Sequence, residues 1–163
     1  MDPIQYLIDK DLESPVYIEA EGPDQSSEAV RPFTKITIRY ADGCEIILDG
    51  NVEKRDDVAF MEGPNGKMFR NMRSTIPDLE KKIALLPDPP PQEMDFHKCV
   101  RERIPFGLND VNGHRSCTLV NMAKIAVRLR RPLHFDPVKQ RFINDDAANR
   151  MVEEPMRAPW RIA

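Results

Sequence analysis

The chain has 163 residues, of which 31% are charged and 40% hydrophobic, and its formal net charge is −3 at pH 7. This length suits a single domain with a substantial hydrophobic core. No apolar run approaches the roughly 20 residues needed to cross a bilayer. The acidic start, Met1-Asp2-Pro3, is unlike a secretory signal peptide. We therefore expect a cytoplasmic protein that does not insert into a membrane.

The charge balance argues against a nucleic-acid partner. Lysine and arginine total 24 against 27 aspartate and glutamate residues, so a phosphate-binding face would require strong local segregation of charge. The densest basic cluster falls in the last turns of a predicted helix, where cations complement the helix dipole. Its members are Lys124, Arg128, Arg130 and Arg131.

Alternation of apolar and polar residues predicts strands in the first half of the chain. The alternating stretches are residues 16–20, 33–40 and 44–48. Asp42-Gly43 predicts a two-residue hairpin between the last two stretches, because glycine tolerates a positive φ. A further hairpin is predicted over residues 58–70, with its turn at 63–66. We therefore expect an antiparallel meander.

The second half is predicted to be helical, with proline residues interrupting the helices. Apolar residues at helical spacing predict helices over residues 77–86, 92–103 and 113–131, each with one apolar stripe, and Asn144 is expected to cap a last helix that ends before Pro155. Pro87–Pro91 predicts a polyproline II spacer. Strands followed by helices favour an α+β fold, here one domain over residues 1–163 that is strand-rich at 15–72 and helix-rich at 77–155.

The glycine pattern argues against a phosphate-binding loop in this chain. None of the seven glycines falls into G-x-G-x-x-G or G-x-x-x-x-G-K-[ST], the turns that cradle the phosphates of nucleotides. We therefore expect this chain alone to bind no dinucleotide.

The cysteines allow two chemical hypotheses. Cys99, His114 and Cys117 could ligate a metal, but they lack paired zinc-ligand spacing and an evident fourth ligand. Cys117 could be a nucleophile with His114 as its base, near a helix start that would lower the thiol pKa. Simple packing of the thiols explains them better. With Cys44 the cysteines are odd in number and widely spaced, so no disulfide framework is predicted.

Residues 112–116, Asn-Gly-His-Arg-Ser, form the most suggestive motif. Its glycine permits close approach of the backbone, and His114, Arg115 and Ser116 could together bind hydroxyls or a carboxylate at a helix N-terminus. A helix cap with a surface ion pair explains the same residues, and composition does not decide between these two interpretations.

A longer set of motifs resembles a known family. The motifs are residues 112–116, 121–126, Arg128-Leu129, 131–133, 135–137, 142–151 and Arg157-Ala158-Pro159-Trp160, in that order. They resemble the C-terminal part of the Gfo/Idh/MocA oxidoreductases, the family of glucose–fructose oxidoreductase and inositol dehydrogenase, and in particular a bacterial branch of dehydrogenases. Earlier segments agree more loosely, so that the resemblance extends over nearly the whole chain.

The resemblance implies a two-domain enzyme whose first half is a Rossmann domain that binds NAD or NADP. That half carries a lysine that assists proton transfer and a histidine followed by an aspartate, which Asp2 matches. The lysine and the histidine are expected upstream of residue 1. For this chain the resemblance implies an open, mainly antiparallel sheet with helices on one face and the other face free for oligomerisation.

Three functional hypotheses follow. The first is the substrate-facing and homo-oligomerisation domain of an NAD(P)-dependent oxidoreductase for sugar-like or polyol substrates, inactive alone, with His114 and Arg115 as substrate-binding candidates and no catalytic, cofactor or metal-binding residue of its own. The second is a stand-alone, non-enzymatic binding or scaffold module that reuses the fold. The third is a small hydrolase that uses Cys117 or a carboxylate pair.

Overall fold

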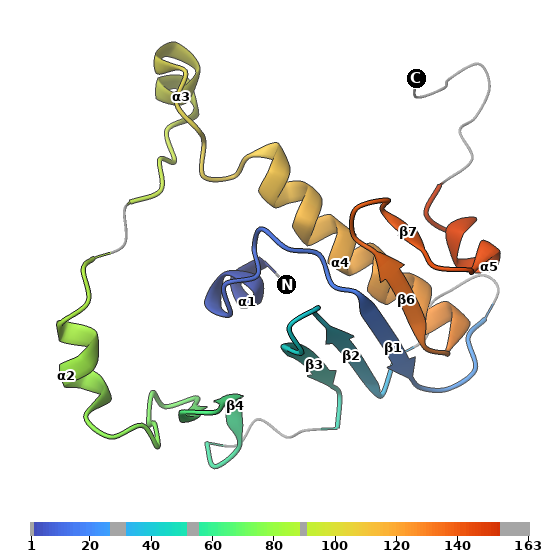
Figure 1. Cartoon of the computed structure of the whole chain (residues 1–163), viewed down its shortest axis with the longest axis horizontal. Coiled ribbons are helices and arrows are strands. Elements are labelled where there is room, and N and C mark those ends of the chain that lie inside the picture. The colour runs from blue at the N-terminus through green and yellow to red at the C-terminus, as the bar shows by residue number, and fades with distance from the viewer. Residues whose placement is uncertain (1, 27–31, 52–55, 89–90, 154–163) are drawn as a thin grey trace. The chain divides into compact units, whose positions relative to one another are not determined.

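The computed structural model describes residues 2–26, 32–51, 56–88 and 91–153. Contacts between residues divide the chain into two units (Figure 1). The first unit comprises residues 1–51 and 107–163, and the second comprises residues 52–106. The predictions for Pro89, Pro90, Pro155 and residues 157–160 lie outside the described residues.

An antiparallel five-stranded sheet forms the centre of the first unit. In spatial order its strands are β3 (Glu45–Asp49), β2 (Lys35–Arg39), β1 (Tyr17–Glu21), β6 (Leu133–Asp136) and β7 (Arg141–Phe142). Ile46 pairs with Ile38, Ile38 with Ile18, and Ile18 with Leu133, so that one apolar row crosses four strands. The predicted alternation and the predicted meander of the first three strands are confirmed.

Helix α4 (Asp110–Leu129) packs on the face of the sheet that carries this row (Figure 1). Its buried residues include Leu119, Met122 and Ala126, as the helical spacing predicts. The helix begins three residues before the predicted start, because the Asn109 side chain accepts a hydrogen bond from the Asn112 backbone N–H at 3.0 Å and caps it. The opposite sheet face remains partly open, with the Arg39 guanidinium over the Tyr17 ring. The predicted α+β class, with an open antiparallel sheet, is confirmed.

The remaining elements of the first unit lie at the two ends of the chain. Helix α1 (Asp2–Leu7) contributes Gln5, whose buried Nε2 donates to the Tyr40 hydroxyl at 3.3 Å. Helix α5 (Asp146–Asn149) lies beside β7. The prediction of Asn144 as its cap is wrong, because the Asp145 side chain accepts from the Ala148 N–H at 3.0 Å.

The loop between β2 and β3 is longer than predicted. The Tyr40 N–H donates to the Cys44 carbonyl at 2.9 Å, and the Gly43 N–H donates to the Tyr40 carbonyl at 3.1 Å. Within this loop, Gly43 alone has a positive φ, 87°. A two-residue type I′ turn needs a positive φ at both central residues. Ala41, Asp42 and Gly43 therefore form a three-residue loop.

The second unit contains a hairpin and two short helices. These elements are β4 (Ala59–Gly63), β5 (Gly66–Phe69), α2 (Leu79–Ala84) and α3 (Phe96–Glu102). The predicted hairpin is confirmed, but the buried stripe predicted for the helix over residues 92–103 is wrong, and the apolar face predicted over residues 77–86 contains no buried residue within α2. Ile83 is 53% exposed and Phe96 59% exposed, and Cys99 is the only buried hydrophobic residue among those described in this unit. Helices of six and seven residues have only about two turns each, which is too short to bury an apolar stripe against a neighbouring element.

Candidate functional site

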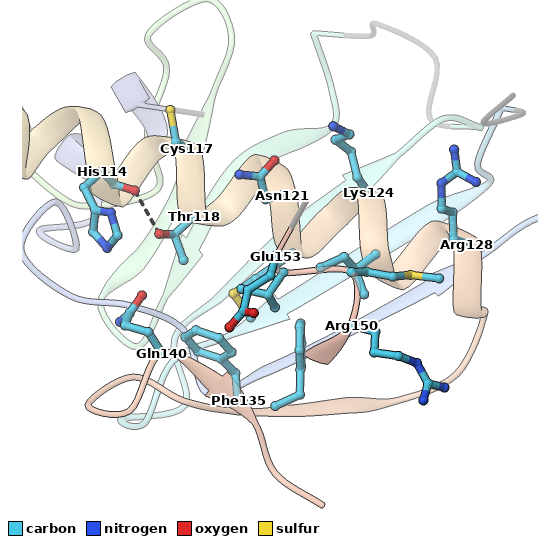
Figure 2. A pocket seen from close by; sticks show the side chains of 15 residues that line it. His114, Cys117, Thr118, Asn121, Lys124, Arg128, Phe135, Gln140, Arg150 and Glu153 are labelled. Carbon is cyan, nitrogen blue, oxygen red and sulfur yellow. Dashed lines mark hydrogen bonds between the residues drawn. The ribbon is translucent and has the colours of Figure 1, made fainter. Parts of the chain in front are cut away.

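A pocket of about 640 Å³ lies beside α4 in the first unit (Figure 2). The helix forms one wall, and Gln140, Phe135, Phe142 and residues 150–153 supply the rest of the lining. Phe135 and Phe142 are paired across β6 and β7, and their rings meet edge to face at 5.3 Å between centroids. The pocket therefore combines a rigid apolar part with polar side chains from α4.

The spacing of residues along α4 explains which side chains reach the pocket. His114, Thr118, Asn121, Ile125 and Arg128 recur at intervals of three or four, which places them along one side of the helix. The Thr118 hydroxyl donates to the backbone carbonyl of His114 at 2.8 Å. Figure 2 shows the His114 ring pointing from α4 toward Gln140 on the facing wall. The polar side chains of His114, Asn121 and Gln140 could bind hydroxyls.

The two residues predicted to bind substrate point to different places. His114 lines the pocket, whereas Arg115 is not among the lining residues. The Arg115 Nη1 donates to the Ser14 hydroxyl at 2.8 Å, and its buried Nε has no hydrogen-bond partner among the described residues. One step along a helix turns a side chain by about 100°, so adjacent residues face different surroundings. The structure therefore does not bring the predicted pair together at the pocket, and both substrate-binding roles stay predictions.

Residues 112–116 were also expected at the very start of a helix. Because Asn109 is the cap, this segment lies inside the first turns of α4 instead. The first two backbone N–H groups of the helix belong to the preceding residues Asp110 and Val111, and those of Asn112 and Gly113 already donate to the side chain and the backbone carbonyl of Asn109.

The thiols do not form the chemical groupings considered from the sequence. His114 and Cys117 both line the pocket, but Figure 2 shows the His114 ring directed toward Gln140 and the Cys117 thiol directed away from it, so they are not arranged as base and nucleophile. Cys99 lies buried in the second unit, and burial raises the pKa of its thiol. All three cysteines are free, and the described residues contain no group of three or more His, Cys, Asp or Glu side chains that could hold a metal.

The basic cluster at the end of α4 divides into two cations that form ion pairs and two that line the pocket. Arg130 pairs with Asp24 at 2.5 Å, and Arg131 binds both carboxylate oxygens of Asp145. The Arg131 guanidinium lowers the pKa of Asp145 to about 2. Lys124 and Arg128 line the pocket instead.

Two further charged residues come from the facing wall. Arg150, just after α5, lines the pocket, as does Glu153, which pairs with Arg141 at 3.0 Å. Sequence reasoning missed Arg150, Gln140 and Glu153, because nothing near them in the chain indicates that they face α4. The alternation of Leu133 and Phe135 was a weak signal for the strand that brings this wall into place.

The start of α4 does not fit the pyrophosphate of a dinucleotide. A helix N-terminus binds phosphate through free N–H groups and a positive dipole end. At the start of α4, however, Asn109 occupies one N–H and Asp110 places a carboxylate in the first turn. We therefore assign no part of a dinucleotide to this chain.

The sheet, the long helix on one of its faces and the pocket beside that helix define an α+β domain. A family model described as "Oxidoreductase family, C-terminal alpha/beta domain" matches residues 1–162. The chain belongs to the Gfo/Idh/MocA oxidoreductase family and corresponds to the family's C-terminal domain. No curated protein and no solved structure gave a significant match. Among the described residues, no helix is both long and apolar enough to cross a membrane.

Proposed function

We propose that this chain is the substrate-facing and oligomerisation domain of an NAD(P)-dependent oxidoreductase that acts on sugar-like or polyol substrates. The observation that carries the proposal is the pocket beside α4, where His114, Asn121 and Gln140 surround an apolar part. Binding sites for small molecules combine an apolar lining with a few polar groups that fix orientation. Imidazole and amide groups can both donate to and accept from sugar hydroxyls.

We also propose that the chain is inactive alone. Hydride transfer requires a nicotinamide held beside the substrate carbon, and the role of the protein is that positioning. Dinucleotide-binding domains are built from parallel βαβ units, whereas every strand pair in the described residues is antiparallel. NAD or NADP would therefore be bound by a separate nucleotide-binding domain.

The open face of the sheet supports the proposed role in oligomerisation. Ile47, on the edge strand β3, is half exposed on the face away from α4, in line with partly open Thr37 and Glu19. A flat, mixed polar and apolar sheet face suits a symmetric contact with a second copy. We expect a homodimer by light scattering, and Ile47→Glu should shift it toward the monomer.

The main test uses the purified 163-residue chain. Calorimetric titration with NADH should give no binding, and assays over a panel of sugars with NAD or NADP should give no turnover. Calorimetry with the same sugars should detect weak binding that His114→Ala reduces. His134→Ala is the matched control, because its ring packs against Tyr17 outside the pocket. Turnover by the chain alone would overturn the proposed inactivity.

A further inference from the structure

We propose that the pocket beside α4 binds an elongated sugar derivative whose anionic group, a phosphate or a carboxylate, lies against Lys124 and Arg128. This inference rests on the proposed function and narrows its substrate class from sugars in general to sugars that carry a negative charge.

The first argument is the selective use of the four cations near the end of α4. Arg130 forms an ion pair with Asp24 and Arg131 forms one with Asp145, and neither arginine lines the pocket. Lys124 and Arg128 line the pocket, and neither has a carboxylate partner among the described residues. The cations that form ion pairs within the chain are therefore distinct from the cations that are available to a ligand.

The second argument is the charge of the lining as a whole. Arg150 adds a third cation without a carboxylate partner in the described part of the chain, and Glu153 is the single acidic residue in the lining. The Glu153 carboxylate is already paired with Arg141. The pocket is therefore positive in a chain whose net charge is −3, which favours an anionic ligand.

The third argument is the arrangement of these groups along the pocket. Figure 2 shows His114 and Gln140 at one end and Lys124 and Arg128 toward the other, with Asn121 between them, while the Arg150 guanidinium on the facing wall points away from those two cations. Ten residues of α-helix separate His114 from Lys124, which corresponds to about 15 Å along the axis. A single sugar ring cannot span that length, so a ligand that uses both ends must be elongated.

The same arrangement assigns a role to each end. Lys124 and Arg128 are four residues apart, so they share one side of α4, where like charges repel unless an anion lies between them. Lysine and arginine form strong charge-assisted hydrogen bonds with phosphate and carboxylate. The end of the pocket with His114 and Gln140 suits sugar hydroxyls, and the basic end with Lys124 and Arg128 suits the anionic group.

The test is calorimetric titration of the 163-residue chain with four probes: glucose, glucose 6-phosphate, glucuronic acid and uridine diphosphate glucose. We expect the diphosphate sugar to bind most tightly and glucose most weakly. Binding of the charged probes should fall several-fold between about 0.05 M and about 0.5 M salt, whereas glucose binding should not change. Comparison of glucose 6-phosphate with glucuronic acid distinguishes phosphate from carboxylate as the anionic group.

A matched pair of double variants isolates the basic end. Lys124→Gln with Arg128→Gln should raise the Kd of the diphosphate sugar roughly tenfold and leave glucose binding unchanged. Lys35→Gln with Lys139→Gln removes the same amount of charge from the same unit outside the pocket, and it should have little effect. Lys124 and Arg128 are exposed, so both double variants should keep the wild-type melting temperature.

Different failures separate this inference from the proposed function. If glucose binds as tightly as the charged probes and depends on His114, the anionic group has no role, but a sugar-binding domain remains. Inorganic phosphate is titrated as a control: if it binds as tightly as the diphosphate sugar, Lys124 and Arg128 form a general anion site and the inference is overturned. If none of the four probes binds, the inference and the proposed sugar-binding role both fall.

Discussion

The two units of this chain use their apolar residues in different ways. In the first unit, apolar residues from all five strands of the sheet, α4 and α5 form one cluster of buried side chains. In the second unit, the hairpin and the two short helices leave residues such as Met72, Leu85 and Phe96 exposed. An apolar stripe therefore forms a core only where a second element of matching length packs against it, as α4 packs against the sheet.

This contrast predicts that the first unit determines the global stability of the chain. Regions with few buried apolar contacts open locally at lower cost than the core does. We therefore expect the second unit to open without unfolding the first. Substitutions in the two units should then differ in their effect on the free energy of unfolding.

The largest effect should come from a matched pair of leucine truncations. Leu119→Ala removes a fully buried side chain between α4 and the sheet and should lower the free energy of unfolding by about 3 kcal/mol, because it leaves a cavity. Leu85→Ala in the second unit truncates a side chain that is 84% exposed, and its effect should stay within about 0.5 kcal/mol. Chemical denaturation followed by circular dichroism measures both. Equal losses for the two variants would show that the second unit has a buried contact of similar strength.

The next effect concerns the hairpin of the second unit. Gly66 has a φ of 146°, and a Cβ placed there would lie 2.7 Å from the Thr75 Oγ1 and 2.8 Å from the Ile76 Cγ1. Thr75 is held in place because its Oγ1 accepts the Lys67 N–H at 2.9 Å. Gly66→Ala should therefore destabilise the hairpin by about 2 kcal/mol.

Gly63→Ala is the matched control for this hairpin, because a Cβ there meets nothing within 4 Å. Hydrogen exchange should show faster exchange of the β4 and β5 amides in Gly66→Ala alone, with the amides of β1 and β2 unchanged. Slower folding or a lower melting point of the first unit in Gly66→Ala would contradict the independence of the two units.

A smaller effect depends on pH. The pKa of Asp145 falls from its ordinary 3.8 to about 2 because Arg131 donates to both of its carboxylate oxygens and the Ala148 N–H donates to one. Because the folded pKa is the lower one, the ionised carboxylate stabilises the fold above pH about 4, and this contribution disappears as the pH falls toward 2. Asp145→Asn should cost about 1–2 kcal/mol at pH 7 and remove this part of the acid dependence.

Asp78→Asn in the second unit is the control for the charge change. Asp78 and Lys81 form an exposed ion pair at 2.9 Å, and such pairs contribute little. Its effect should stay within about 0.5 kcal/mol at every pH. Urea denaturation at pH 7 and at pH 3 compares the two variants, and an equal response would show that the Asp145 pair is also dispensable.

The parts of the fold that the sequence predicts best are those where local pattern and tertiary cover agree. Ile18, Ile36 and Ile38 alternate in the chain and face α4 in the structure, while the stripe of α4 faces them in turn. Helix starts are less predictable, since the helix predicted from Gly113 begins at Asp110 behind the cap Asn109, and Asp145 caps α5 in place of the predicted Asn144. Several residues of Asn and Asp type compete for each cap, and the backbone path decides between them.

The candidate site was predictable only in part. His114 belongs to a recognisable motif, but the facing wall comes from β6, β7 and the residues after α5, whose approach to α4 depends on contacts distant in sequence. Arg115 shares the motif of His114, yet it turns to Ser14, because the helix rotates it away from the pocket. Local sequence identifies candidate side chains, and the packing of the elements selects among them.

The smallest perturbation uses the cysteines as reporters of each unit. Cys117 is exposed on α4, whereas Cys99 is 6% exposed, and desolvation raises the pKa of the Cys99 thiol, so it holds less reactive thiolate. A thiol reagent at pH 8 should modify Cys117 at least about tenfold faster than Cys99 in the native chain. Mass spectrometry of digested samples assigns the modified residue. At denaturant concentrations below the global midpoint, Cys99 should accelerate while the circular dichroism of the first unit stays constant, because opening of the second unit exposes it. If Cys99 instead became reactive only together with global unfolding, the two units would form one cooperative structure, and the contrast between them would concern burial alone.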